Sequence, residues 1–431
     1  MDDAVRRFSE DTWTAGVVGL GYVGLPLAVT AAEAGLKVIG FDVASDRVAA
    51  LNRGRSHVGD VTDEELRGAL DSGAAFTDVA SQLSAADAIF VAVPSPLGRN
   101  RQPDMSYIEA AAETVGRVAR SGQLISLEST TYPGTTEDYF LPVLRQAGLE
   151  LDRDVWVSFS PERVDPGNVL HTADIPKVVG GVTELSGQVA VAAYARLVAK
   201  VHRVSSARAA ELTKLLENTY RAVNIAMVNE LAQVAHAFGI DIWEVIEAAA
   251  TKPFGFEPFY PGPGVGGHCI PLDPQFLAWR AREARVATRF IDLAEDVNVH
   301  MPDYVAGRIM DELNERGLPI AGTRVLGVGV AYKANVSDER ESPAFDVLER
   351  LARRQAELGV LDPHVPMQRL ERLGYQVVSP EADLSEWTLA VVLTDHRAID
   401  YESLARDVDV VFDTRGIYRR LGIDADNVVK L

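Results

Sequence analysis

The chain has 431 residues, 47% of them hydrophobic, and a formal net charge of −20, which is enough for two or three domains with sizeable cores. Such an acidic chain is a poor partner for nucleic acid or an anionic membrane, although one cleft can still be locally basic. With one cysteine, scattered histidines and no long apolar run, the sequence predicts a cytoplasmic protein without a disulfide, metal site, signal peptide or transmembrane helix.

The first part of the chain alternates short apolar, β-branched runs with Ala-rich helical stretches. Strands that alternate with helices form a parallel sheet with helices on both faces. Residues 1–204 are therefore predicted to be an open α/β domain. Its expected strands are 16–19, 37–42, 88–93, 123–128, 155–160 and 177–180.

The character of the chain changes after residue 204. One long helix is predicted over 205–238, with Ser205 or Ser206 as its N-cap and Gly239 as its stop. A short helical stretch follows, then a loop dense in Gly and Pro at 252–274, then more helix. We assign 205–316 to a central helical segment.

The β/α alternation restarts near residue 324 and predicts a second, smaller domain over 317–431. The run RVLGVGVAYK there weakly echoes the first strand and turn, AGVVGLGYVG. The expected fold is α/β, with two Rossmann-like open parallel sheets joined by a long central helix. The strands expected in the second domain are 324–330, 356–362, 376–378, 389–393 and 410–413.

A G-x-G-x-x-G run follows the first predicted strand and opens a helix, and an acid, Asp42, ends the next strand. Gly19 permits a tight turn, Gly21 lets a pyrophosphate approach the backbone, and Gly24 lets the helix pack on the strand. The helix N-terminus offers N–H groups to the phosphates. Asp42 suits the ribose hydroxyls and favours NAD over NADP, although Arg47 could receive a 2′-phosphate.

The turn after the predicted strand 88–93 is rich in proline. In an open parallel sheet this position borders the ligand crevice, although the pattern alone also fits an ordinary turn. The NAD contacts predicted from these two regions are Gly19, Gly21, Tyr22, Val23, Gly24, Asp42, Arg47, Pro94 and Ser95.

The single cysteine, Cys269, lies in the Gly- and Pro-rich loop. A lone cysteine is most often an inert core residue. This loop, however, is a poor place for core packing and a good one for close approach of backbone to a ligand. His268 directly precedes the cysteine and Asp273 follows four residues later.

Several separated motifs, taken together, resemble the UDP-glucose and UDP-N-acetylhexosamine 6-dehydrogenase family. The resemblance covers nearly the whole chain after the first dozen or so residues. It implies two Rossmann-like domains, a long helix that forms a homodimer contact, and an active site between the domains. The motifs are GLGYVGLPLA at 19–28, ESTTYPGT at 128–135, SPER at 160–163, ELTKLLENTY at 211–220, GGHC at 266–269, AYK at 331–333 and RES at 340–342.

The resemblance implies a four-electron oxidation of a sugar's C6 hydroxymethyl group to a carboxylate, with two NAD⁺ used in succession. Cys269 would attack the intermediate aldehyde to give a thiohemiacetal, and a second hydride transfer would give a thioester that water cleaves. A thiolate suits this chemistry because it is a strong nucleophile and its acyl adduct is activated for hydrolysis.

Lys214 and Asn218 are four residues apart and share one face of the predicted long helix. By resemblance they point at C6, where the ammonium stabilises oxyanions or acts as a base and the amide adds a neutral donor. Asp273 could accept a proton in the first oxidation, and Glu162 could activate the hydrolytic water with Thr130 positioning it. The alternative for Lys214 is a solvated helix face, and the alternatives for Asp273 and Glu162 are a loop cap and a surface acid.

The remaining site residues rest on the resemblance alone. A packing or substrate-contact role for His268 is preferred over activation of the thiol. Tyr332 stands where a third glycine would, which counts against a second NAD site. Substrate contacts are expected from Glu162, Arg163, Lys214, Asn218, Phe259, Tyr260, Gly266 and Lys333, and further NAD contacts from Thr130 and Arg340.

Other functions are less well supported. A single-oxidation β-hydroxyacid dehydrogenase would need no cysteine, and a non-catalytic NAD sensor could lose the thiol, the lysine and the asparagine. A short-chain epimerase needs Tyr-x-x-x-Lys, which the sequence lacks. Histidine before the cysteine resembles the N-acetylhexosamine branch. UDP-N-acetylglucosamine is therefore favoured over UDP-glucose and UDP-N-acetylmannosamine, and a thymidine-linked sugar stays open.

Overall fold

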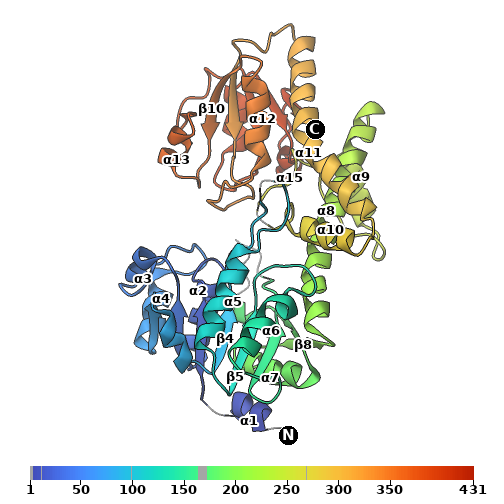
Figure 1. Ribbon diagram of the computed structural model, residues 1–431. Helices are drawn as coiled ribbons and strands as arrows, with labels where there is room; N and C mark the ends of the chain where they lie inside the picture. Colours follow the sequence, from blue (N-terminus) through green and yellow to red (C-terminus); the bar gives the residue numbers. More distant parts are fainter. Residues whose placement is uncertain (1–2, 11, 99, 164–171, 268) are drawn as a thin grey trace. The chain divides into compact units, whose positions relative to one another are not determined.

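Short apolar strands build two mostly parallel sheets, each in its own unit of the chain (Figure 1). The computed structural model describes residues 3–10, 12–98, 100–163, 172–267 and 269–431. Unit 1 comprises Met1–Glu217 and Gln275–Val286, and unit 2 comprises Asn218–Pro274 and Ala287–Leu431. The three-part division expected from the sequence stays a prediction.

The sheet of unit 1 has the strand order β3-β2-β1-β4-β5-β6-β7-β8. Its central strands are buried along their whole length, as expected where helices cover both faces. One pair, β6 with β7, is antiparallel, a common departure in large doubly wound sheets. The strands are β1 (Thr14–Val18), β2 (Lys37–Phe41), β3 (Ala74–Thr77), β4 (Ala88–Val91), β5 (Gln123–Leu127), β6 (Val155–Phe159), β7 (Lys177–Gly181) and β8 (Val201–Val204).

Two hydrophobic clusters lie on opposite faces of this sheet. Phe90 of β4 belongs to one cluster, and its neighbours Ile89 and Val91 belong to the other, because successive strand residues point to opposite faces. The helices of unit 1 are α1 (Asp3–Glu10), α2 (Gly24–Glu33), α3 (Ser45–Leu51), α4 (Asp63–Asp71), α5 (Ser106–Val118), α6 (Thr135–Gln146) and α7 (Glu184–Tyr194), with 3₁₀ turns at Ala80–Ala85 and Thr172–Asp174.

The predicted long helix is α8 (Ala207–Ala237), and the boundary between the units falls inside it, after Glu217. It is followed by α9 (Ile242–Ala250), α10 (Asp273–Glu283) and α11 (Arg289–Glu315). Within the described residues, no helix combines the length and apolar composition needed to cross a bilayer.

The sheet of unit 2 is parallel throughout, in the order β11-β10-β9-β12-β13-β14. The predicted α/β class with two open sheets and a long helix is thus confirmed. The elements are β9 (Arg324–Val328), α12 (Pro343–Ala352), β10 (Glu357–Leu361), α13 (Met367–Arg372), β11 (Gln376–Val377), β12 (Leu389–Val392), α14 (Tyr401–Asp407), β13 (Val410–Asp413), α15 (Ile417–Leu421) and β14 (Val428–Lys430).

The two sheets begin in the same way. Gly19 after β1 and Gly329 after β9 both have positive φ, at 88° and 75°. Each donates its N–H to the last residue of the neighbouring strand, Phe41 or Leu361, at 2.8 Å. The first strand ends at Val18, one residue before the predicted end, because Gly19 turns the chain out of the sheet. The predictions missed β3, β8 and β14, which are short and carry weak strand signals.

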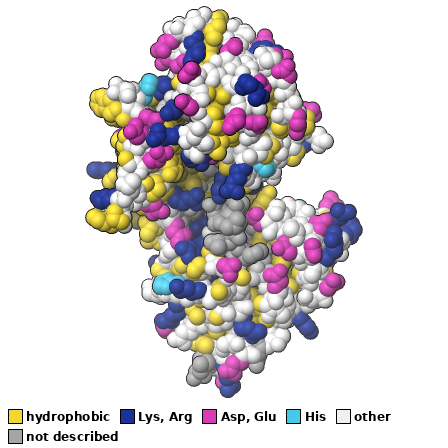
Figure 2. Space-filling view, turned by 180° about the vertical axis from the view of Figure 1, so that it is seen from behind, with side chains coloured by type: hydrophobic (Ala, Val, Ile, Leu, Met, Phe, Trp, Pro, Cys, Tyr) yellow, Lys and Arg dark blue, Asp and Glu magenta, His cyan; other side chains and the backbone are white. Residues whose placement is uncertain are grey.

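Apolar side chains stay exposed on the helical part of unit 2 (Figure 2). Met227, Leu231 and Val234 of α8 are 51%, 46% and 43% exposed, and Phe238, just past its end, is 72% exposed. Their spacing of four, three and four residues places them on one helix face. The four side chains therefore form an exposed apolar stripe along one side of the helix.

Candidate active site

The turn after β1 has the shape that a dinucleotide requires. A Cβ on Gly19 would lie 2.5 Å from the carbonyl oxygen of Ala92, and one on Gly24 would lie 1.8 Å from that of Gly19. Both positions therefore need glycine. A Cβ on Gly21 would meet nothing within 4 Å, so this residue faces open space at the N-terminus of α2. The residues present fit a bound pyrophosphate.

Asp42 lies buried directly after β2 and is tied to this turn. Its carboxylate accepts hydrogen bonds from the N–H of Leu20 at 2.9 Å, the N–H of Ala44 at 3.0 Å and the guanidinium of Arg47 at 2.9 Å. Although burial opposes ionisation, these bonds hold the pKa of Asp42 below its usual value. Arg47 thus forms an ion pair with the acid that was expected to select NAD.

The other NAD candidates follow neighbouring strands of the same sheet. Pro94 and Ser95 follow β4, and Thr130 follows β5, so they lie at the carboxyl edge shared with the turn after β1. Ser95 is buried, Thr130 is half-buried, and Tyr22 and Pro94 are exposed. The structure therefore brings these candidates to one edge of the sheet.

Lys214 and Glu162 meet in unit 1. The ammonium of Lys214 donates to the backbone carbonyl of Glu162 at 2.7 Å. Arg163 binds Glu217 of α8 through two nitrogens, at 3.2 and 2.6 Å, and donates to the carbonyl of Pro176 at 2.8 Å. The segment at 162–163 is thus fastened to one turn of α8 at two points.

A lysine that the sequence analysis did not consider, Lys177, completes this cluster. Its ammonium lies 2.6 Å from a carboxylate oxygen of Glu128 and 2.9 Å from one of Glu162. The hydroxyl of Tyr194 donates to the other oxygen of Glu128 at 2.7 Å. A lysine at the start of an otherwise apolar, buried strand is the sequence signal that could have revealed it.

Glu211, the first residue of the helix motif on α8, has a structural role. Its buried carboxylate accepts from the N–H of Gly134 at 2.6 Å and from the N–H and hydroxyl of Thr136 at 2.9 and 2.7 Å. It therefore caps the N-terminus of α6. Burial raises the pKa of Glu211 despite these hydrogen bonds.

The second group of candidates lies in unit 2. The amide of Asn218 donates to a carboxylate oxygen of Asp273 at 2.5 Å, and both side chains are buried. The carbonyl of Cys269 accepts from the N–H of Leu272 at 3.3 Å and that of Asp273 at 2.9 Å. The half-buried cysteine therefore stands in the turn that opens α10, close in the chain to the carboxylate that Asn218 binds. His268 lies outside the described residues.

The two glycines before the cysteine are required by close neighbours in unit 2. A Cβ on Gly267 would lie 2.7 Å from two ring carbons of Tyr332, and one on Gly266 would lie 2.7 Å from the carbonyl oxygen of Glu341 and from Cδ of Pro343. Gly267 also has a φ of +81°. Earlier in the loop, the N–H of Gly262 donates to buried Asn229 of α8 at 3.0 Å. The cysteine loop is thus held at both ends by side chains of unit 2.

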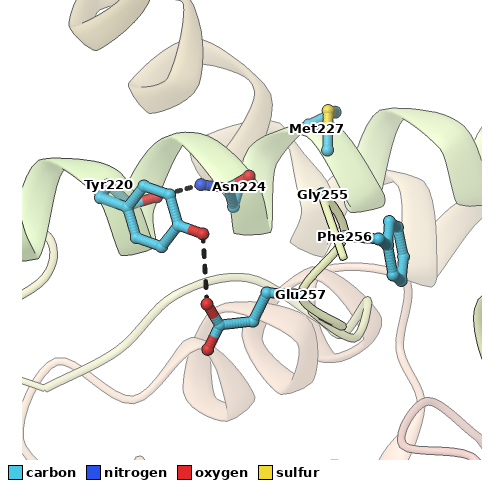
Figure 3. Close-up of a pocket in the computed structure, with 6 residues that line it drawn as sticks. All are labelled: Tyr220, Asn224, Met227, Gly255, Phe256 and Glu257. Carbon is cyan, nitrogen blue, oxygen red and sulfur yellow. Dashed lines mark hydrogen bonds between the residues drawn. The ribbon is translucent and has the colours of Figure 1, made fainter. Parts of the chain in front are cut away.

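Aromatic side chains of the same loop pack beside α8 and α9. Phe259 meets Tyr220 edge-to-face, and Tyr260 stacks on Trp243. Next to them is an open pocket of about 390 Å³ (Figure 3), in which the hydroxyl of Tyr220 points to Glu257 at 3.4 Å. The pocket contains none of the predicted site residues. It is lined by Tyr220, Asn224, Met227, Gly255, Phe256 and Glu257.

The loop after β9 carries the two remaining candidates. Lys333 is half-buried, and the exposed guanidinium of Arg340 binds Asp338 at 2.6 and 2.8 Å. The N–H of Asn335 donates to the buried ring of His396 at 2.9 Å, on the nitrogen opposite the one that faces Asp362 at 3.1 Å.

Asp362 lies directly after β10, the position that Asp42 occupies after β2. It accepts from the N–H groups of Val330 and Ala331 at 2.7 and 3.0 Å and, through its other oxygen, from those of His364 and Val365. Although burial opposes ionisation, the bond from His396 and these backbone bonds hold the pKa of Asp362 far below its usual value.

Comparisons with known proteins identify the same family along most of the chain. Three models of the UDP-glucose/GDP-mannose dehydrogenase family match it in order: the NAD binding domain at residues 14–198, the central domain at 208–300 and the UDP binding domain at 326–420.

Individual relatives cover most of the chain. An NDP-N-acetyl-D-galactosaminuronic acid dehydrogenase of Ralstonia nicotianae is 37% identical, over 96% of this chain and 98% of its own. A UDP-N-acetyl-D-glucosamine 6-dehydrogenase of Pseudomonas aeruginosa is 38% identical, over 81% and 82%. The solved structure of a UDP-D-ManNAc dehydrogenase from Pyrococcus horikoshii superposes with a TM-score of 0.86 at 31% identity, over 97% and 98%.

Proposed function

Because the chain belongs to the UDP-glucose/GDP-mannose dehydrogenase family and is an NAD-dependent oxidoreductase of nucleotide sugars, we propose that it oxidises C6 of a UDP-N-acetylhexosamine to a carboxylate through a covalent bond to Cys269. One observation carries this proposal. The chain's single cysteine stands in the turn that opens α10, and the acid that begins this helix, Asp273, is bound by Asn218.

The first oxidation needs a base for the C6 hydroxyl and a donor for the developing oxyanion. We assign the base to Asp273, directly or through water, and the donors to Lys214 and Asn218, which are one helical turn apart on α8. The turn after β1 and Asp42 would hold NAD⁺, which would supply the hydride acceptor for both oxidations.

The thiolate of Cys269 adds to C6 of the aldehyde and forms a C–S bond, giving a thiohemiacetal that becomes a thioester in the second oxidation. Water then attacks the thioester carbon, its proton passes to Glu162, and the C–S bond breaks to release the thiolate. Overall one hydroxymethyl group, one water and two NAD⁺ give one carboxylate, two NADH and three protons. Lys214 stabilises the negative oxygen at each stage.

The substrate is proposed on chemical likeness. The names of the three relatives above all contain an N-acetylated amino sugar, and they differ in the hexose. The histidine before Cys269 points to the same branch. We therefore place UDP-N-acetylglucosamine first, with its mannosamine epimer and UDP-glucose as the alternatives to be tested, followed by a thymidine-linked sugar. Contacts are assigned to Phe259, Tyr260, Gly266 and Lys333.

We also propose that the protein forms a homodimer through α8. The exposed apolar stripe of Met227, Leu231, Val234 and Phe238 supports this, because such a face is stabilised by burial against a second apolar surface.

The test is a panel of nucleotide sugars, with NADH and product mass measured for the native protein and for Cys269→Ala. We expect two NADH per uronate from the native protein, and no uronate from the variant. Two NADH per uronate from Cys269→Ala would refute the covalent route. One NADH per aldehyde from the native protein would instead indicate a single-oxidation enzyme.

A further inference from the structure

Glu128, Lys177 and Glu162 form a buried cluster of charged side chains in unit 1. The side chains of Glu128 and Lys177 are 0% and 3% exposed, whereas that of Glu162 is 13% exposed. Burying charged groups costs more than burying apolar side chains of similar volume, so such a cluster is weak support for a purely stabilising role. A functional role for Glu162, the most exposed member of the cluster, explains the buried charges better.

The cluster fixes Glu162 from several sides. One carboxylate oxygen faces the ammonium of Lys177 at 2.9 Å, and the other accepts the N–H of Arg163 at 2.6 Å. The backbone carbonyl of the same residue receives the ammonium of Lys214 at 2.7 Å. Glu162 is thus linked to one lysine through its side chain and to another through its main chain.

Lys177 is in turn held from behind. Glu128, directly after β5, binds it at 2.6 Å, and Tyr194 of α7 donates to the far oxygen of that acid. Burial alone would lower the pKa of Lys177, but the two carboxylates outweigh burial and raise it. The lysine therefore stays cationic. Burial raises the pKa of Glu128, despite its contact with Lys177.

We propose that Lys177, anchored by Glu128, is a positioning residue that aims the carboxylate of Glu162 and keeps it ionised for the hydrolysis of the acyl-enzyme. The inference rests on the proposed function, in which Glu162 takes the proton of the attacking water. Among the described residues, the charged and titratable groups around Glu162 include Lys177 from β7, Glu128 after β5 and Lys214 from α8. Arg163 is adjacent in the chain, Glu217 binds Arg163, and Tyr194 binds Glu128.

The experiment compares Lys177→Met with Lys177→Arg and with Glu162→Gln in the full-length protein. After mixing with UDP-N-acetylglucosamine and NAD⁺, the NADH burst is followed, and acid-quenched protein is weighed by intact mass spectrometry. Lys177→Met should release two NADH per site in the burst and then accumulate the thioester. Its steady-state rate should fall by about 10²–10⁴-fold, the usual worth of a general base. Lys177→Arg should restore part of the rate.

A second reading separates positioning from mere stability. In Lys177→Met, the acid limb of the hydrolysis rate should move to higher pH, because a carboxylate without its ammonium protonates more readily. In Glu128→Gln, which keeps the shape of the side chain and removes a negative charge, the limb should move to lower pH. If Lys177→Met does not fold, the shift of the acid limb in Glu128→Gln still tests the proposal.

The outcomes distinguish the two proposals. The positioning role of Lys177 is wrong if Glu162→Gln accumulates thioester but Lys177→Met does not. It is also wrong if neither Lys177→Met nor Glu128→Gln moves the acid limb of the hydrolysis rate. In both cases the proposed function stands. If Glu162→Gln hydrolyses its thioester at the native rate, the role of Glu162 falls and the inference falls with it.

Discussion

A methyl group added at Gly267 should disable the cysteine loop, and its cost follows from two features of this position. An alanine at a φ of +81° costs about 1–2 kcal/mol in backbone strain. Its Cβ would also lie 2.7 Å from two ring carbons of Tyr332, and overpacking of this kind costs about 1–3 kcal/mol. The expected total for Gly267→Ala is therefore about 2–5 kcal/mol.

The same loop contains a matched control. Gly255 has a φ of +68°, close to that of Gly267, but a Cβ added there would meet nothing within 4 Å. Gly255→Ala should therefore show the strain alone, about 1–2 kcal/mol, reduced by the lower entropy of its unfolded chain. The difference between the two variants isolates the contact with the Tyr332 ring.

The loop is expected to shift and relieve part of this energy, which would displace Cys269. Because a displacement of about 1 Å at a reacting group can cost about 10²-fold in rate, Gly267→Ala should lose about 10²-fold in kcat, and Gly255→Ala much less. The assays are uronate formation and the rate at which iodoacetamide alkylates the thiol. Equal activity and equal thermal midpoints for the two variants would refute the reasoning, since only one of them meets the ring.

Two further predictions concern Asp42 and Asp362, which occupy equivalent positions after β2 and β10. Asp362→Asn should lower the unfolding free energy of unit 2 by about 1–3 kcal/mol at pH 7, since its bonds to backbone N–H groups and His396 are weakened or lost. Because the folded-state pKa of Asp362 is depressed, its contribution is present above about pH 4, the unfolded value, and the gap between variant and native protein should close as the pH falls further. Thermal melts at several pH values check this, and a gap that does not change with pH contradicts it. Asp42→Ser should raise the KM for NAD⁺ by about 5–100-fold and improve the use of NADP⁺ relative to NAD⁺, because it removes a ribose acceptor and a negative charge. An unchanged ratio of kcat/KM for the two cofactors would show that this acid does not select between them.

Much of the fold could be read from local patterns. The long helix was expected over 205–238 and is Ala207–Ala237, because unbroken helix formers with a stop at Gly239 leave few alternatives. The turn glycines and Asp42 were found because their spacing within one βαβ unit is set by local geometry. The edge strands β8 and β14 were missed, since partly exposed strands of three or four residues carry little periodic signal.

The partners of the site residues could not be read in the same way. Asn218 finds Asp273 55 positions along the chain, and Lys177 joins acids 49 and 15 residues before it. The contacts of Lys177 depend on the order of strands in the sheet, and the Asn218–Asp273 pair depends on where the start of α10 lies beside α8, neither of which a short window of sequence contains. Family motifs supplied the identities of most candidates, and Lys177, which stood in none of the motifs used, was overlooked.

The repeated beginning of the two sheets also limits what a protein engineer could retrofit. Because Gly329 occupies the place of Gly19, a coenzyme fingerprint in the second half of the chain would need glycine in place of Ala331 and Ala334. The acid waiting there, however, is already saturated by five donors, against three for Asp42 among the described residues. The ribose hydroxyls of a coenzyme bound there would find no free lone pair on Asp362. A variant designed to bind NAD at this sheet would therefore also need a replacement for His396 and a different conformation of the loop after β9 that His396 binds.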